Sequence, residues 1–494
     1  MQGESLFCAD LSSAFQPQIG RILVTGASGY IGGRLVPELL ARGYRVRIMV
    51  RAPSPEYALR WPGAEIVVAD ALDQDQLARA LEGIDTAYYL LHSLLRGPKE
   101  FEGVDLRVAK NFRVAAEGRN VRRIIYLGGL GDTRGVLSSH LRSRMEIAQE
   151  LRSGKTPVTI LRAAIIIGSG SASYEIIYHL VRKLPFILLP EWAKSKCQPI
   201  AVRDVIKYLV GVLEIPQTAG KSFDIGGRSV LTYQRMLKLV ALLLNKKTVF
   251  IPSFFSDINI YAYVASLYTP VPAPIIQCLL EGASNEVVCQ ENSIHAFLPF
   301  TPLSFKESIV RAISRVEQDT VATRWSDAYP PAHELALKLH EIAAGISYTK
   351  HSSLVTSKEA GALFRSICMI GGKQGWFHTN WLWRLRGALD RLLGGVGTAR
   401  GRKSQTKLEI NDVIDFWRVE DLQPGKRLLL RAEMKLPGRA WLEFNIDDIQ
   451  GARKLSVTAY YDTDSAAGRV YWFLCYPFHL FIFDNLIRTI EKRS

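Results

Sequence analysis

The sequence lacks a CxxC cysteine pair, a long uninterrupted apolar run and any extended block of one charge. Its six scattered cysteines predict neither a zinc site nor a redox pair, and they are typical of thiols in a reducing compartment. We therefore expect a cytoplasmic protein without a bound metal. Residues 1–20 contain Glu4 and Asp10 but no basic segment followed by an apolar core, so no signal peptide is predicted.

The apolar runs fall short of the roughly 20 residues that a bilayer-spanning helix needs. Residues 470–483 are the main candidate, and they include Pro477 and His479. No transmembrane segment is therefore expected. We interpret the run as a buried helix, and a position at a membrane surface is the alternative.

The net charge of +15 suits attraction to phosphates, anionic lipids or nucleic acids. However, the basic residues are scattered, and the longest basic stretch covers only residues 400–403. No nucleic-acid motif accompanies them. A basic soluble enzyme is the simpler interpretation, and no nucleic-acid partner is expected.

Strand-like and helix-like segments alternate from residue 21 to about residue 225. This alternation predicts an α/β fold with a Rossmann-type, doubly wound parallel sheet. The β-branched segment 158–167 is expected to form one long strand of that sheet.

The pattern changes in the second half of the chain. The prolines at 330–331 and the polar residues 351–353 suggest a junction near residue 350. Beyond residue 363, successive strand-like segments precede a long apolar helix over 470–491, which predicts an α+β domain. The expected domains are an extension over 1–20, a nucleotide-binding domain with its substrate-side region over 21–345, and a second domain over 346–494.

The strongest motif is the sequence TGASGYIG between the first predicted strand and a helix. Its glycines at 26, 29 and 32 allow a sharp turn, close approach to a pyrophosphate, and tight packing of the helix on the sheet. The helix N-terminus then offers free N–H groups to the phosphates. The residues expected to bind a dinucleotide here are Thr25, Gly26, Ala27, Ser28, Gly29, Tyr30, Ile31 and Gly32.

The choice of cofactor depends on the end of the second predicted strand. Arg51 lies there, and no acid follows before Glu56. An acid would bind the ribose 2′-OH of NAD, whereas an arginine suits the 2′-phosphate of NADP. We therefore expect NADP, with NAD as the alternative, and Arg34 is a candidate to assist Arg51.

The glycine motif, Arg51 and Asp70 after the third predicted strand together resemble the short-chain dehydrogenase/reductase superfamily in its atypical, NmrA-like branch. The resemblance implies that Asp70 and the adjoining Ala71 lie near the adenine. It implies that the next strand end, at Leu91, His92 and Ser93, lies beside the cofactor ribose.

Active members of that superfamily carry a Tyr-x-x-x-Lys pair on the helix after the fifth strand, where the tyrosine exchanges a proton with a carbonyl oxygen. Here His140 occupies the tyrosine place and Arg144 the lysine place, and glycines 128 and 129 replace the usual Ser or Thr. In one interpretation His140 is the acid, although a neighbouring Arg144 disfavours its protonated form. In another, His140 only packs, hydride chemistry is lost, and the domain binds cofactor as a sensor or scaffold.

Residues 371–384, 415–418, 437–441 and 477–479 resemble the DUF2867 family, and the whole chain resembles bacterial two-domain proteins of the YbjT type. DUF2867 is itself similar to START-like (SRPBCC) helix-grip proteins, in which a curved sheet wraps a long terminal helix. The resemblance implies that aromatic residues of this helix either line an apolar cavity or fill a core. These residues are Tyr471, Trp472, Phe473, Phe478, Phe481 and Phe483.

The segment 381–386, with Arg391, mixes tryptophan, leucine and arginine. We interpret it as a helix docked on the sheet, and a position at a lipid surface is the alternative.

These patterns favour an NADP-binding, oxidoreductase-like protein with a substituted catalytic pair that acts on or binds an apolar small molecule. Whether it is an active enzyme stays open. One alternative is a non-enzymatic regulator or assembly factor that senses NADP(H). Another is a carrier of lipid or another apolar ligand through the C-terminal domain.

Overall fold

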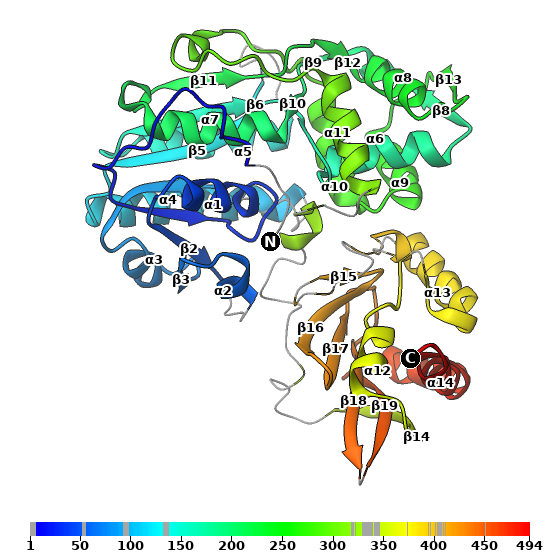
Figure 1. Ribbon diagram of the computed structural model, residues 1–494. Coiled ribbons are helices and arrows are strands. Elements are labelled where there is room, and N and C mark those ends of the chain that lie inside the picture. Colours follow the sequence, from blue (N-terminus) through cyan, green and yellow to red (C-terminus); the bar gives the residue numbers. More distant parts are fainter. Residues whose placement is uncertain are drawn as a thin grey trace. The chain divides into compact units, whose positions relative to one another are not determined.

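The structure is a computed structural model, and it describes residues 6–51, 56–91, 98–131, 138–317, 321, 323–328, 339, 346–372, 374–393, 395, 397–400, 402, 408, 410, 412–449 and 451–494. The chain divides into two compact units (Figure 1). The first contains Met1–Ala265 and Ala273–Ala332, and the second contains Ser266–Pro272 and His333–Ser494.

A parallel sheet forms the centre of the first unit (Figure 1). Its seven strands are β1 (Arg21–Thr25), β2 (Val46–Val50), β3 (Glu65–Val68), β4 (Ile84–Tyr89), β5 (Arg123–Gly129), β6 (Val158–Ala163) and β11 (Ser222–Ile225). They lie in the order β11–β6–β5–β4–β1–β2–β3, and every neighbouring pair is parallel. The doubly wound arrangement predicted from the sequence is confirmed.

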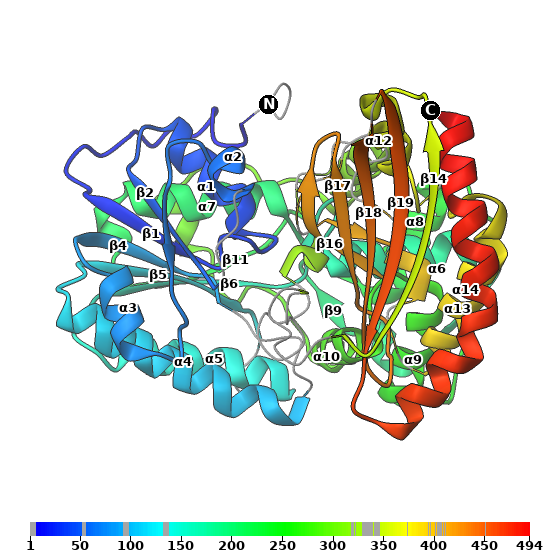
Figure 2. The ribbon, with the colours of Figure 1, turned by 90° about the horizontal axis from the view of Figure 1, so that it is seen from below.

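Helices cover both faces of this sheet (Figure 2). They are α1 (Gly32–Ala41), α3 (Gln74–Ala80), α4 (Pro98–Gly118), α5 (Ser139–Arg152) and α7 (Val202–Glu214), and the short α2 (Glu56–Arg60) follows β2. One apolar core joins α1 and α7 to the sheet, and a second core joins α3, α4 and α5 to it. Two separate cores explain why the inner strands are buried along almost their whole length.

The glycine motif follows β1, the strand at which the chain changes its winding direction. Strand β1 pairs with β2 on one side and with β4 on the other. The connections that leave the carboxyl ends of β1 and β4 therefore run to opposite faces of the sheet. A crevice opens at such a switch point, and it is the usual ligand site of this architecture.

The segment 158–167 does not form the single strand expected from its β-branched residues. Strand β6 ends at Ala163, and a separate β7 (Ile166–Ile167) pairs with β10 (Ile200–Ala201). Between them the chain changes partner, because Ile165 O accepts a hydrogen bond from Ile200 N at 2.9 Å. Side-chain branching favoured extended backbone in both pieces, but only tertiary pairing decided where the sheet ends.

A substrate-side region with its own apolar core follows the sheet. Its remaining strands, in three short pairs with β7 and β10, are β8 (Phe186–Leu189), β9 (Lys196–Cys197), β12 (Leu231–Thr232) and β13 (Val249–Pro252). Its helices are α6 (Ala172–Lys183), α8 (Tyr233–Leu243), α9 (Ile258–Tyr268), α10 (Ala273–Ala283) and α11 (Phe305–Glu317).

An antiparallel sheet forms the second unit. In the order of the sheet, its strands are β14 (Tyr348–Thr356), β19 (Ala452–Asp462), β18 (Arg439–Ile449), β17 (Arg427–Ala432), β16 (Trp417–Gln423) and β15 (Val413–Ile414). The polar residues 351–353, interpreted from the sequence as part of a junction, lie inside β14.

Three helices accompany this sheet, namely α12 (Ala360–Ile367), α13 (Asn380–Leu392) and the terminal α14 (Ala466–Arg493). The terminal helix packs on β14. Trp472 stacks on Tyr348 with ring centroids 5.5 Å apart, and Thr356 Oγ1 donates to Glu491 Oε1 at 3.0 Å. The predicted α+β domain, an antiparallel sheet with a long terminal helix, is confirmed.

Helix α14 differs from the buried helix expected for residues 470–483. It extends beyond that run at both ends, and it is long and apolar enough to cross a membrane by length and composition alone. Phe473, Phe478 and Phe481 are each more than half exposed, whereas Trp472 and Phe483 are buried. Of the aromatic residues expected to line a cavity or fill a core, these three exposed ones do neither.

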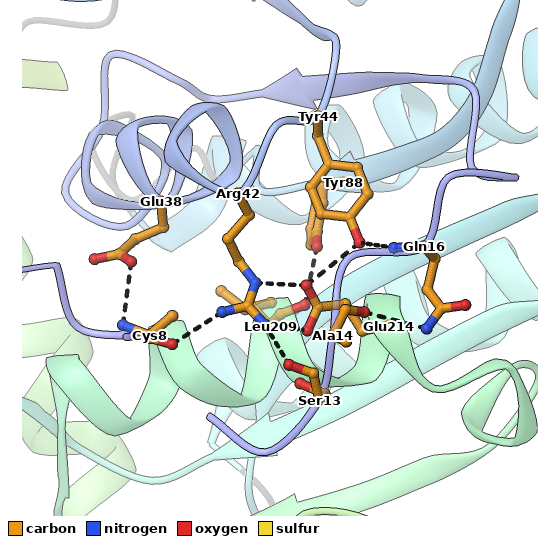
Figure 3. Close-up of polar contacts among 10 residues, drawn as sticks. All are labelled: Cys8, Ser13, Ala14, Gln16, Glu38, Arg42, Tyr44, Tyr88, Leu209 and Glu214. Atoms are coloured by element: carbon orange, nitrogen blue, oxygen red, sulfur yellow. Dashed lines mark hydrogen bonds and ion pairs between the residues drawn. The ribbon is translucent and has the colours of Figure 1, made fainter. Parts of the chain in front are cut away.

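Residues 6–20, which we call the N-terminal strap, pack on the first unit (Figure 3). The carboxylate of Glu38 in α1 accepts hydrogen bonds from Phe7 N at 2.5 Å and Cys8 N at 3.1 Å. Lys207 of α7 donates to the Asp10 carboxylate at 2.7 Å. The strap therefore bridges α1 and α7 through polar contacts of its backbone and side chains.

Arg42, which follows α1, is the centre of this attachment (Figure 3). Its guanidinium donates to two strap carbonyls, those of Cys8 at 2.9 Å and Ser13 at 2.5 Å. It also forms a bidentate pair with Glu214 of α7, at 2.5 and 2.7 Å, and the Glu214 side chain is 0% exposed. Because a buried carboxylate is costly unless it is paired, Arg42 makes the strap an integral part of the domain.

Candidate functional site

Thr25 fixes the start of the glycine loop to the neighbouring strand. Its buried hydroxyl donates to Tyr88 O at 2.9 Å and accepts from Leu90 N at 3.1 Å. These bonds join the carboxyl ends of β1 and β4. The loop over residues 25–32 therefore begins from a rigid point at the switch between the two halves of the sheet.

Two glycines of the motif are required by the loop itself. Gly26 has φ +65°, and a Cβ there would lie 2.6 Å from Leu90 O. A Cβ on Gly32 would lie 2.3 Å from Gly26 O and 2.8 Å from the Cα of buried Ala27. Since real Cβ atoms do not approach backbone so closely, no other residue fits without moving the loop.

Gly29 is different, because the protein itself places little against it. Its φ is not positive, and a Cβ would meet only Gly26 O, at 3.2 Å. A small side chain would therefore require a shift of only a few tenths of an ångström, far less than at Gly26 or Gly32. A glycine at this second position is what a closely approaching pyrophosphate requires. The loop fits a dinucleotide, with Ser28, Gly29 and Tyr30 leading to Ile31 at the N-cap of α1.

Arg51 and Asp70 follow neighbouring strands at the same edge of the sheet. Arg51 comes directly after β2 and is exposed. Asp70 comes shortly after β3, where its carboxylate accepts from Leu72 N at 2.9 Å, and the adjoining Ala71 is buried. Because β2 pairs with β3 in parallel, the structure brings both residues to the carboxyl side of the sheet, beside the loop after β1.

The expected ribose-side residues are described only in part. Leu91 is half-buried just beyond β4. His92 and Ser93 lie outside the described residues, so their proposed contact with a ribose stays a prediction.

Arg34 does not have the phosphate-binding role considered for it. Its guanidinium is buried and donates to three carbonyl groups, those of Tyr30 at 3.2 Å, Thr323 at 3.1 Å and Ser169 at 2.9 Å. It thereby ties the start of α1 to the substrate-side region. The sequence could not reveal this role, because two of the three partners are more than 130 residues away.

His140 and Arg144 both lie on α5, as the resemblance implied. His140 is half-buried. Arg144 is directed at the preceding strand: its guanidinium donates to Leu127 O and lies 5.2 Å from the ring centroid of Tyr126. Its Nη1 atom is buried and makes no hydrogen bond. Arg144 is thus partly committed to β5, while its Nη1 atom remains without a hydrogen-bond partner.

The glycines at the end of β5 leave room for α5 rather than for a hydroxyl. A Cβ on Gly129 would lie 3.1 Å from Leu141 Cδ2 and 3.6 Å from Arg144 Cγ. A Cβ on Gly128 would lie 3.1 Å from the Tyr126 ring. The serine or threonine expected in active relatives would crowd these groups, so its absence matches the packing of the helix.

Two tyrosines lie near the site: Tyr126, which the sequence did not single out, and Tyr30, which it indicated only as part of the glycine loop. Tyr126 donates to Arg144 O at 3.1 Å, and burial raises its pKa. Burial also raises the pKa of Tyr30, whose hydroxyl lies where a side chain at residue 168 would go. A proton-exchanging tyrosine needs a lowered pKa. Neither residue therefore substitutes for the missing catalytic tyrosine.

The described part of the chain holds no cluster of three or more His, Cys, Asp or Glu residues suited to a metal ion. All six cysteines are free thiols, and burial raises the pKa of each. Raised thiol pKa values disfavour the reactive thiolate, so none of the cysteines resembles a nucleophile.

The fold and the loop define a Rossmann-type dinucleotide-binding domain, followed by an antiparallel-sheet domain. Residues 26–181 match the model of the NAD(P)H-binding family. Residues 342–486 match the model of DUF2867, a family of proteins of unknown function. The chain therefore carries an NmrA-like NAD(P)-binding domain and a DUF2867 domain, as the sequence motifs implied.

The curated relatives that match this chain share only part of its length. A 3-beta-hydroxysteroid dehydrogenase of Mycolicibacterium neoaurum is 36% identical over 117 residues, which are 22% of this chain and 31% of that protein. The divinyl chlorophyllide a 8-vinyl-reductase of Cucumis sativus is 24% identical, over 49% of this chain and 60% of that protein. The photosystem II assembly factor Ycf39 of Trieres chinensis is 22% identical, over 42% and 64%. This chain thus spans less than two thirds of each relative.

Solved structures with similarity to this chain include WbmG of Bordetella bronchiseptica in complex with NAD. It has 14% sequence identity and a TM-score of 0.49, over 63% of this chain and 97% of that one. A nucleoside-diphosphate-sugar epimerase of Staphylococcus aureus has 15% identity and a TM-score of 0.49, over 58% and 99%.

Proposed function

We propose that this chain is an NADP-binding, oxidoreductase-like protein whose cofactor loop is intact and whose proton-donating pair is substituted. The proposal rests on a difference among the three glycines of the motif: two are required by the fold of the loop, and one is not. The loop itself needs Gly26 and Gly32, whereas at Gly29 a Cβ would meet a single protein atom, Gly26 O at 3.2 Å, and a glycine there suits a closely approaching pyrophosphate.

In this proposal the backbone of residues 26–32 and the N-terminus of α1 hold the pyrophosphate. Arg51 binds the 2′-phosphate, and Asp70 with Ala71 borders the adenine. Leu91, His92 and Ser93 border the ribose, and Arg144 Nη1 donates to a hydroxyl group. A bound nicotinamide supplies hydride transfer at its ring.

The substituted pair limits the chemistry that these residues can support. No tyrosine with a lowered pKa stands beside the site among the described residues, and Arg144 partly serves β5. His140 is the remaining candidate acid on α5. We expect proton transfer to a carbonyl oxygen to be weak or absent. An apolar small molecule is the substrate or ligand class we favour, since relatives include a steroid dehydrogenase.

The test of cofactor binding uses Gly29→Ala, because of the three glycine positions this one requires the smallest shift of the free loop. Titration with NADPH, followed by calorimetry, should show affinity weakened by about tenfold or more, with an unchanged melting temperature. Gly282→Ala is the matched control, since a Cβ there has no neighbour within 4 Å, and it should bind like the parent protein. Equal affinity in the two variants would contradict the proposed site.

Loss of chemistry has its own test. Purified protein should not oxidise NADPH when a carbonyl compound is added. If it does, and His140→Ala abolishes the oxidation while Gly282→Ala does not, then His140 is a catalytic acid and the chemistry is retained.

A second candidate function is a regulator or assembly factor that senses the ratio of NADP⁺ to NADPH. It is favoured by the substituted pair and by similarity to Ycf39, whose name describes an assembly factor. A sensor must bind the two redox forms with different affinity, since a ligand shifts an equilibrium only by its differential affinity. Equal dissociation constants for NADP⁺ and NADPH would exclude this candidate.

A further inference from the structure

Two helices of the second unit expose large apolar side chains to solvent. Ten such residues are each between 48% and 68% exposed. We call them the apolar face; they are Trp381, Leu385, Leu389, Leu392 and Leu393 along and just after α13, and Val470, Phe473, Leu474, Phe478 and Phe481 of α14.

The ten residues occupy one side of each helix. Within each helix they recur at the three- and four-residue spacing of a single helical stripe. The opposite side of each helix is buried. It carries Trp383 and Asp390 in α13, and Trp472 and Phe483 in α14. The apolar face is therefore additional to the surface with which each helix packs on its own domain.

The two stripes are neighbours. Arg386 of α13 donates from Nε to the Tyr471 hydroxyl of α14 at 3.1 Å, and its guanidinium lies 5.7 Å from the centroid of that ring. Figure 2 shows the two helices along the same side of the second unit. The contact holds the two helices beside each other, on the same side of the second unit.

An apolar surface of this extent indicates a binding partner. At each of these ten positions about half or more of the residue stays exposed to water, so much of the stabilisation that burial would provide is not realised. Monomeric soluble proteins seldom leave contiguous apolar patches larger than a few hundred Å² without a function.

The charges around the apolar face indicate the chemistry of that partner. Residues 466–483 contain a single ionised side chain, that of Arg469, which is exposed. In α13 Arg384 is exposed, whereas the only acid, Asp390, is 0% exposed and accepts from Gly397 N and Lys435 N. One exposed acid, Asp484, follows Phe481 by about one turn of α14, and exposed Arg488 follows it by another turn. Aromatic residues beside arginines that outnumber the exposed acids are typical of surfaces that bind anionic lipid headgroups and the adjoining acyl chains.

The packing of α14 on its own domain excludes a membrane-spanning position for this helix in the folded protein. The second half of α14 buries Leu486, Ile487 and Ile490 against the domain, and Glu491 bonds to β14. A transmembrane orientation would expose these residues and break that bond. We infer that the apolar face is a peripheral docking surface for an anionic lipid bilayer, on which α13 and α14 lie in the plane of the interface.

The inference can be tested with the full chain and sedimented vesicles of phosphatidylcholine, with or without an equal part of phosphatidylglycerol. We expect binding to the anionic vesicles that weakens as salt rises. Phe473→Ser with Leu474→Ser should weaken it about tenfold or more, since two anchoring side chains are lost. Leu242→Ser is the matched control, because Leu242 is 75% exposed in α8 of the other unit, and it should bind normally.

A second variant separates charge from apolar contact. Arg384→Glu with Arg469→Glu should weaken binding to anionic vesicles and reduce its salt dependence, while the folded state persists in circular dichroism. Absence of vesicle binding overturns the inference. It is also overturned if light scattering shows a concentration-dependent dimer that Phe473→Ser with Leu474→Ser dissolves, because the face would then bind a second copy of this chain.

Discussion

The N-terminal strap and the apolar face on α13 and α14 are both regions in which the protein accepts an unfavourable arrangement. Beneath the strap it buries charged groups, and on the apolar face it exposes large hydrophobic ones. Under the strap the compensation is internal, because Arg42 and Glu214 satisfy each other and two backbone carbonyls. On the apolar face no compensation exists within the described chain. Buried charges that are paired within the protein, as beneath the strap, stabilise its own structure. Exposed apolar side chains without a partner, as on the apolar face, indicate an interaction with another molecule.

The largest effect on stability should come from breaking the ion pair between Arg42 and Glu214 beneath the strap. Arg42→Ala leaves the fully buried Glu214 carboxylate without its cation, and we expect a loss of about 3–5 kcal/mol in the free energy of unfolding. Urea denaturation measures this loss. The matched control is Lys194→Ala, because Lys194 and Glu191 form an ion pair whose side chains are 67% and 80% exposed, and the change should cost less than about 1 kcal/mol. Equal losses would mean that the strap contact is not structural.

A pH experiment should give opposite signs in the two units. Burial lowers the pKa of His479 in α14 to about 4. In the unfolded chain His479 binds a proton below about pH 6.5, whereas in the folded protein it does so only near pH 4. The contribution of neutral, buried His479 to stability is therefore lost as pH falls from about 6.5 to 4. Burial raises the pKa of Asp204 in α7 to about 6, so its contribution is complete below about pH 3.8 and lost as pH rises towards 6.

Relative to the parent protein, His479→Leu should therefore gain stability as pH falls from 6.5 to 4, by up to about 3 kcal/mol. Asp204→Asn should gain stability relative to the parent protein as pH rises from 4 to 6. In the parent protein Leu303 N donates to the Asp204 carboxylate at 2.7 Å, and the amide oxygen of asparagine can accept the same hydrogen bond. Unfolding curves across this range measure both. Differences that do not vary with pH would contradict the buried, neutral state of these groups.

The smallest effect should come from the exposed end of the cofactor site. Arg51→Ala should weaken NADPH binding by about 10- to 100-fold, the value of a charge-assisted hydrogen bond, and leave NADH binding nearly unchanged. Calorimetry with both dinucleotides measures the selectivity. Arg34→Lys is a useful comparison: because Arg34 holds carbonyl groups of the protein, its loss should lower stability rather than cofactor selectivity. Unaltered selectivity in Arg51→Ala would leave NAD as the favoured cofactor.

The sequence predicted local features of the site better than distant ones. The glycine loop was predictable because each glycine acts within a few residues, and its position after an apolar strand follows from the alternating pattern. The partners of Arg34 were not predictable, since Ser169 and Thr323 come close only after the substrate-side region has folded. Similarly, the order of residues indicated Arg144 as the counterpart of a catalytic lysine, but could not indicate that its guanidinium is directed at Leu127.

The apolar sequence of the terminal helix illustrates the same division. Its composition determined that residues 470–483 would be helical and apolar, and this holds in α14. Composition could not decide which of its sides would meet the sheet. That choice depends on how β14 and α13 are placed, through contacts such as those of Trp472 with Tyr348 and Tyr471 with Arg386.

By itself, the sequence determined the order of the elements, the winding of the parallel sheet and the loop that receives a dinucleotide. Backbone geometry and hydrophobic periodicity act over short distances, so these features are written along the chain. Only the tertiary structure decided which arginines face carbonyl groups and which face solvent, and which side of each apolar helix stays exposed. Burial depends on residues far apart in the sequence, and burial is what assigns each charged or apolar side chain its energetic role.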